Sequence, residues 1–64
     1  MITINGKKIN VAEINLDDYL KNNRFNTERI VIELNGDILP KSEYKSTILK
    51  ENDVAEILTF VGGG

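Results

Sequence analysis

Three consecutive glycines, at positions 62 to 64, close the sequence and directly follow the apolar segment from Thr59 to Val61. Glycine has no side chain, so a run of glycines can thread a narrow channel and carry a terminal carboxylate to a reacting group. We therefore predict that Gly64 is the reactive residue and that Gly62 and Gly63 are its spacer. Three extended residues span about 10 Å at most, so any partner that uses this end must dock closely.

Glycine-rich chain ends are also common as inert segments, and an interaction module with a functionless tail is the alternative from a different class. The apolar residues before the glycines favour an ordered strand that holds the tail at one point of the fold. We expect a single domain over residues 1–61 and a flexible tail over residues 62–64.

The composition excludes most kinds of side-chain catalysis. The 64 residues contain no cysteine and no histidine, which removes thiolate nucleophiles, disulfides and the commonest metal ligands and general bases. We expect no cofactor, no metal and no catalytic side chain, so the protein would not itself be an enzyme. The formal net charge of −2 argues against a nucleic-acid partner.

The hydrophobic pattern gives no sign of a membrane protein. Apolar runs are too short to cross a bilayer, and the first residues lack the pattern of a signal peptide. We therefore expect a cytoplasmic protein with no membrane partner.

Two Asn-Gly pairs predict two β-hairpins. Asn5-Gly6 separates residues 1–4 from residues 7–11, and Asn35-Gly36 separates residues 30–34 from residues 37–39. Asn-Gly favours the two-residue type I′ turn, in which both central residues have positive φ. This turn would pair Ile4 with Lys7, and Leu34 with Asp37.

A short helix is expected after the first hairpin. Asn15 is a suitable N-cap, and Asp17 and Asp18 would lie in the first turn, where the helix dipole favours negative charge. Leu16 and Leu20 have the spacing of an apolar stripe, which ends at Asn22 and Asn23.

The predicted order of elements is β-β-α-β-β-β, which indicates an α+β fold with one mixed β-sheet packed against one short helix. Ser42 is expected to cap a helical turn after Pro40, and Asn52-Asp53 to form a turn. The predicted core is aliphatic and consists of Ile2, Ile4, Ile9, Val11, Leu16, Leu20, Ile30, Ile32, Leu34, Leu39, Ile48 and Ile57.

The last strand is expected to run from Val54 to about Val61. If Ile57 points into the core, the alternation of a strand turns Glu56, Leu58 and Phe60 outward. Exposed apolar side chains beside the reactive end would form a surface for a partner protein, and we predict that these three residues provide it. The alternative is that a loop or the far end of the helix covers them.

Two segments give the chain a specific resemblance. Residues 30–44 contain Asn-Gly, then proline with a basic residue and an aromatic, and residues 56–64 end in Thr-Phe-Val-Gly-Gly-Gly. These features resemble the ubiquitin-like β-grasp sulfur carriers, most closely the family that serves thiamine biosynthesis. The chain departs from that family at Asn52, where glycine is common, at Ala55, where a larger aliphatic is usual, and at Tyr44, where tryptophan is frequent.

The resemblance implies a carrier that is the substrate of its partners. An ATP-dependent adenylyltransferase would activate the Gly64 carboxylate, a persulfide sulfur donor would convert it to a thiocarboxylate, and thiazole synthase would receive the sulfur. Two relatives of the same fold remain as alternatives, the small subunit of molybdopterin synthase and a ubiquitin-like protein modifier. Adenylation is common to all three, so the final acceptor separates them.

Overall fold

The computed structural model describes residues 1–60, and the predicted tail lies outside this range. The strands are β1 (Ile2–Ile4), β2 (Lys7–Ile9), β3 (Glu13–Asn15), β4 (Ile30–Leu34), β5 (Asp37–Leu39), β6 (Ile48–Lys50) and β7 (Val54–Thr59). The helices are α1 (Leu16–Asn22) and two 3₁₀ helices, η1 (Thr27–Arg29) and η2 (Lys41–Ser46). No helix within this part of the chain has the length and apolar character needed to cross a bilayer.

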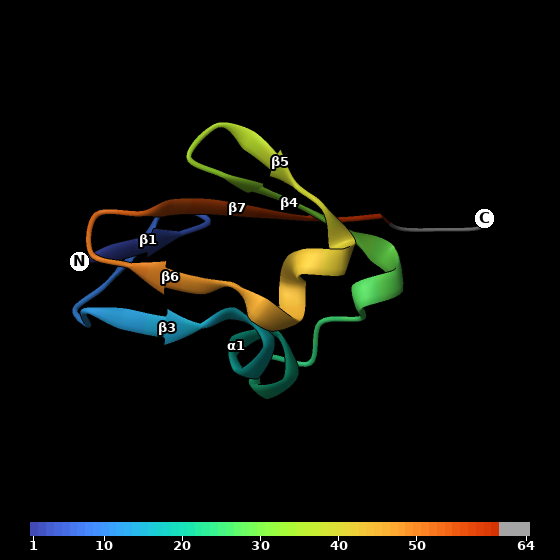
Figure 1. The fold of residues 1–64 in the computed structure, drawn as a ribbon, viewed down its shortest axis with the longest axis horizontal. Helices are drawn as coiled ribbons and strands as arrows, with labels where there is room; N and C mark the ends of the chain where they lie inside the picture. The colour runs from blue at the N-terminus through green and yellow to red at the C-terminus, as the bar shows by residue number, and fades with distance from the viewer. Residues whose placement is uncertain (61–64) are drawn as a thin grey trace.

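The main sheet has five strands in the order β2-β1-β7-β4-β5. β7 runs parallel to β1 and antiparallel to β4, so the sheet is mixed, as predicted. The last strand in sequence is therefore central in space, with α1 and the β3–β6 pair on one side of it (Figure 1). Together these layers form the β-grasp arrangement that the sequence predicted.

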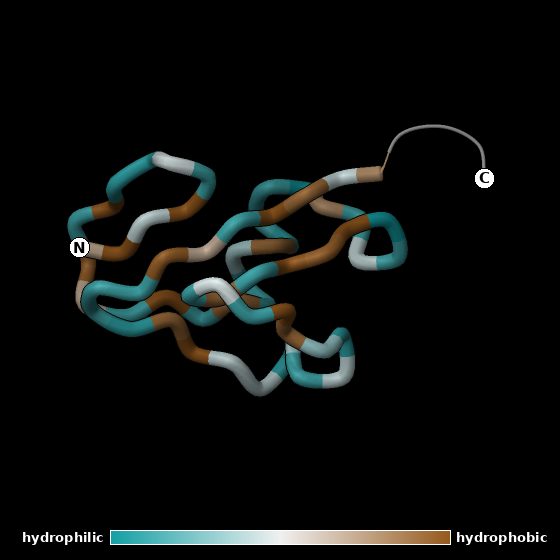
Figure 2. The backbone as a smooth tube through the Cα atoms, turned by 90° about the horizontal axis from the view of Figure 1, so that it is seen from above, coloured by the Kyte–Doolittle hydropathy of each residue, from teal (hydrophilic) through white to brown (hydrophobic). Residues whose placement is uncertain are grey.

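Both predicted hairpins are confirmed, with their register. Asn5 and Gly6 have φ values of 51° and 79°, and Asn35 and Gly36 have values of 53° and 89°, as a type I′ turn requires. Ile4 pairs with Lys7, and Leu34 pairs with Asp37. In Figure 2 the loops that join the strands are largely hydrophilic, whereas the hydrophobic stretches fall mainly within strands.

The predicted helix and its cap are also confirmed. The Asn15 side-chain oxygen accepts a hydrogen bond from the Asp18 backbone N–H at 3.0 Å, which satisfies one of the free donors at the helix start. Leu16 and Leu20 are fully buried on the face that meets the sheet. The helix ends at Asn22, with Asn23 as its C-cap.

A second, two-stranded sheet of β3 and β6 was not predicted. Ile14 pairs with Leu49 across it, and Leu49 is fully buried. Because side chains alternate along a strand, Leu49 turns inward and Ile48 turns outward. The prediction that Ile48 belongs to the core is therefore wrong, since 39% of it is exposed.

Three other local expectations differ from the structure. Val11 is 40% exposed because β2 ends at Ile9, before the alternation reaches it. Tyr44, which was not among the predicted core residues, is only 4% exposed. Ser42 does not cap a helix, because η2 begins at Lys41 directly after Pro40 and has no side-chain cap.

Candidate functional site

The predicted reactive residue Gly64 and its spacer, Gly62 and Gly63, lie outside residues 1–60. The described chain leads toward them through Phe60, whose backbone N–H donates a hydrogen bond to the Arg29 carbonyl at 2.8 Å. Phe60 directly follows the last residue of β7 and is hydrogen-bonded to the last residue of η1. Both connections fix its position. The predicted reactive end is thus attached to an anchored strand.

β7 is held by its neighbours along most of its length. β4 pairs with it from Ala55 to Thr59, and β1 pairs with it at Val54 and Ala55. At Ile57, beyond the end of β1, the Asn5 side chain makes the hydrogen bonds to the β7 backbone that a further β1 residue would make. Its Oδ1 accepts from the Ile57 N–H at 2.6 Å and its Nδ2 donates to the Ile57 carbonyl at 3.2 Å.

The alternation along β7 places its residues as the sequence predicted. Ala55 and Ile57 are buried, whereas Leu58 and Phe60 are 49% and 59% exposed. Glu56 is exposed on the same outer face. These observations show an accessible surface, and its use by a partner stays a prediction.

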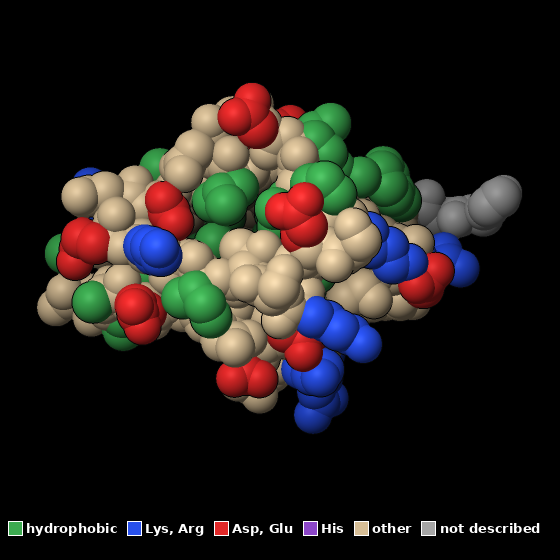
Figure 3. All heavy atoms as spheres, in the orientation of Figure 1, with side chains coloured by type: hydrophobic (Ala, Val, Ile, Leu, Met, Phe, Trp, Pro, Cys, Tyr) green, Lys and Arg blue, Asp and Glu red, His purple; other side chains and the backbone are tan. Residues whose placement is uncertain are grey.

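Neighbouring strands enlarge this surface. Val31 on β4 lies opposite Leu58, and Ile38 on β5 is 69% exposed. We call the four residues Val31, Ile38, Leu58 and Phe60 the outer sheet patch. Figure 3 shows hydrophobic side chains gathered near the end of β7 and beside β5. Sequence reasoning missed Ile38, although the register predicted for the second hairpin turns it away from the buried face.

Two glutamates lie within the same face. Glu33 on β4 stands directly opposite Glu56 on β7, and Ile38 on β5 is the next neighbour of Glu33. Like charges directly opposite each other in an antiparallel pair are destabilising. This face of the sheet therefore combines exposed apolar side chains with a pair of like negative charges.

Within residues 1–60, no three carboxylates or other ligand side chains lie close enough together to hold a metal ion. Buried side-chain polar atoms in this range all have hydrogen-bond partners.

Comparison with known families agrees with this geometry. The ThiS family model matches residues 2–64. In a crystal structure of a thiamine biosynthesis protein, ThiS, from Geobacter metallireducens, a chain with 30% sequence identity superposes with a TM-score of 0.74. That match covers 98% of this chain and 97% of the other, so the whole architecture is common to both.

Three relatives are similar to the chain over nearly its whole length. The chain is 44% identical to an uncharacterized protein, ycf40, of Porphyra purpurea, over 98% of this chain and 90% of that one. It is 32% identical to the sulfur carrier protein ThiS of Bacillus subtilis, over the full length of both. It is also 31% identical to a thiazole synthase of Paramagnetospirillum magneticum, where the match covers 98% of this chain but only 20% of that protein.

Proposed function

The chain belongs to the ThiS family, and from this premise we propose that it carries sulfur for thiamine biosynthesis. In this role the protein is a substrate that its partner enzymes modify, and its own side chains perform no chemistry. The observation that carries the proposal is that the family match continues through residue 64 and so includes the three glycines.

The proposed chemistry takes place at Gly64. Its carboxylate oxygen attacks the α-phosphorus of ATP on an adenylyltransferase, pyrophosphate leaves, and an acyl-adenylate forms. A persulfide sulfur then attacks the activated carbonyl carbon and AMP leaves. Cleavage of the sulfur–sulfur bond by a thiol leaves a thiocarboxylate on Gly64, and the thiol becomes part of a disulfide.

The outer sheet patch is the proposed docking surface for these partners. Leu58 and Phe60 supply exposed apolar area, and Glu56 beside them supplies negative charge. Apolar contact contributes affinity, whereas the charge mainly raises the association rate with a basic surface. Because the spacer is short, docking here would leave little freedom in where Gly64 is presented.

Thiazole synthase is the proposed acceptor of the sulfur. The thiazole synthase of Paramagnetospirillum magneticum contains a segment similar to nearly the whole of this chain. A carrier-like segment within the same polypeptide supports the idea that the carrier and the synthase act together. In this chain the two would meet by docking.

Intact mass measurement tests the proposal. The protein is mixed with ATP, an adenylyltransferase of the ThiS pathway and a persulfide donor, and we expect replacement of one C-terminal oxygen by sulfur. A chain extended by one alanine after Gly64 is the matched control, because it keeps the fold but moves the carboxylate. An unchanged mass of the natural chain, or equal sulfur incorporation by the extended chain, would contradict the proposal.

A further inference from the structure

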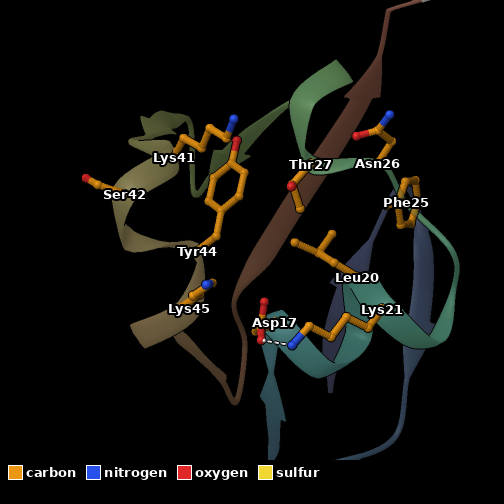
Figure 4. A pocket seen from close by; sticks show the side chains of 10 residues that line it. All are labelled: Asp17, Leu20, Lys21, Phe25, Asn26, Thr27, Lys41, Ser42, Tyr44 and Lys45. Atoms are coloured by element: carbon orange, nitrogen blue, oxygen red, sulfur yellow. Dashed lines mark ion pairs between the residues drawn. The ribbon is translucent and has the colours of Figure 1, made fainter.

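A hollow of about 650 Å³ lies on the side of the sheet opposite the outer sheet patch. Its lining comes from α1, the segment after α1, η1 and η2. Leu20 is fully buried beneath it, Tyr44 is 4% exposed, and Phe25 is partly buried against the core. In Figure 4 these three side chains surround the cavity from two sides, with Tyr44 facing Leu20 and Thr27. The hollow is thus apolar at its base.

The rim of the hollow is basic. Lys21, Lys41 and Lys45 line it, and Asp17 is the only acidic residue among the lining residues that the structure describes. Asp17 is already paired with Lys21 at 2.9 Å, and Lys41 pairs with Glu28, whereas Lys45 makes no ion pair within residues 1–60. This local excess of positive charge stands out in a chain whose formal net charge is −2.

The hollow lies at the end of the molecule from which β7 points toward the predicted tail. Asn26 and Thr27 form one of its walls, and both belong to the segment that leads into β4 through η1. The last residue of η1, Arg29, accepts the hydrogen bond from Phe60. Figures 1 and 4 both show the end of β7 passing beside η1.

From this geometry we propose that the hollow is a second docking site, which takes a large apolar side chain flanked by carboxylates. The occupant is an acidic segment of the protein that processes the tail, and the inference rests in this respect on the proposed function. Charge complementarity favours the carboxylates, because three lysines line the hollow beside its apolar base and one of them, Lys45, makes no ion pair within residues 1–60. Because the hollow lies beside the end of β7, we expect its occupant to be a segment of the protein that binds that end.

The two surfaces carry opposite charges, so a partner that contacts both would bind in one orientation. Glu33 and Glu56 lie on the same sheet face as the outer sheet patch, whereas lysines line the hollow. A partner that meets both must present a basic surface to one side of the sheet and an acidic segment to the other. Opposite charges at two points fix the orientation of a complex, since the reversed orientation would juxtapose like charges.

A peptide probe tests the site without any partner enzyme. The acetylated and amidated tripeptide Glu-Phe-Glu is titrated into ¹⁵N-labelled protein, with Lys-Phe-Lys as its matched control. We expect saturable amide shifts at Leu20, Phe25 and Tyr44 with the acidic peptide alone. Equal shifts with both peptides, or shifts confined to other residues, would overturn the proposed chemistry of the site.

Charge reversal tests the site in the carrier reaction. Lys45→Glu removes the lining lysine that makes no ion pair within the described residues, and Lys8→Glu makes the same charge change on the edge strand β2. We expect Lys45→Glu to raise the KM of sulfur incorporation about 10-fold at low salt, with a smaller effect at high salt, and Lys8→Glu to change it about 2-fold at most. Circular dichroism establishes that both variants are folded.

The outcomes separate this inference from the proposed function. If the natural chain incorporates sulfur and the two charge variants have equal KM values, the second site is refuted and the carrier role stands. If the natural chain incorporates no sulfur but binds only the acidic peptide, the carrier role is refuted while the binding site stands.

Discussion

Asn5 illustrates how one residue serves two structural needs. Its positive φ allows the type I′ turn, and its side-chain amide pairs with both backbone groups of Ile57, as another residue of β1 would. Asn35 acts similarly in the second hairpin, because its Oδ1 accepts from the Val54 N–H at 2.8 Å. The two turn asparagines therefore attach both hairpins to β7, the strand that leads to the tail. Their turns were predictable from Asn-Gly, but these contacts join residues far apart in the sequence.

Replacing Asn5 with aspartate should weaken this attachment. Asn5→Asp keeps the size of the side chain but removes the amide donor, and it places a carboxylate beside the Ile57 carbonyl. We expect the free energy of unfolding to fall by about 1–3 kcal/mol, measured by urea denaturation. The exposed Asn10→Asp is the control for the added charge, and equal unfolding midpoints for the two variants would contradict the role of Asn5.

Lys21 should show a pH dependence that reports on its pair with Asp17. The hydrogen bond to the Asp17 carboxylate, and then the attraction between the two charges, raise the pKa of Lys21 above its ordinary value of 10.5. Since the folded pKa exceeds the unfolded one, this contribution to stability is complete below pH 10.5 and is lost as the pH rises through the folded pKa.

The Lys21 prediction is checked by NMR titration of its ammonium group. We expect a midpoint above 10.5 in the natural chain and a lower midpoint in Asp17→Asn, which replaces the charged hydrogen-bond acceptor with a neutral amide. Asp37→Asn, a carboxylate change on the strand β5, should leave the Lys21 titration unchanged. An identical Lys21 midpoint in Asp17→Asn and the natural chain would show that the pair does not form.

At the scale of elements, the alternation along β7 turns some residues into the core and others to the face proposed for docking. Ile57 is 5% exposed, whereas its neighbour Leu58 is 49% exposed. We expect Ile57→Ala to lower the free energy of unfolding by about 2–5 kcal/mol because it leaves a cavity in the core. Leu58→Ala should change stability by about 0.5 kcal/mol or less.

The same pair of variants should behave in the opposite way in the carrier reaction. Leu58→Ala is expected to raise the KM for sulfur incorporation, because it removes apolar area from the outer sheet patch without disturbing the fold. Folded Ile57→Ala, assayed below its unfolding temperature, should keep a KM close to that of the natural chain. A natural KM for Leu58→Ala would show that partners dock elsewhere.

The elements that the sequence revealed are those with local signals. Asn-Gly defined both hairpins, and Asn15 with its acidic first turn defined α1. β3 and β6 have no such signal, because each is only three residues long and more than 30 residues of chain separate them. The burial of Leu49 and the exposure of Ile48 both depend on that distant pairing, which explains why the sequence alone did not disclose them.

For the molecule as a whole, the fold and the proposed reactive end are encoded by separate parts of the chain. The buried core lies between Ile2 and Ile57, and the outer sheet patch ends at Phe60. Both are therefore encoded before the glycines begin. A chain that lacks residues 62–64 should keep its fold and its docking surface while losing the proposed reactive carboxylate.

Such a truncated chain should act as a competitive inhibitor of the natural one. If docking occurs at the outer sheet patch as proposed, the chain of residues 1–61 should raise the apparent KM for sulfur incorporation into the natural chain without changing kcat. Adding Phe60→Ala to the truncated chain should weaken the inhibition, because Phe60 contributes exposed apolar area to the patch. If the truncated chain fails to inhibit although it is folded, the glycines themselves supply most of the binding energy, and the outer sheet patch is not the principal docking surface.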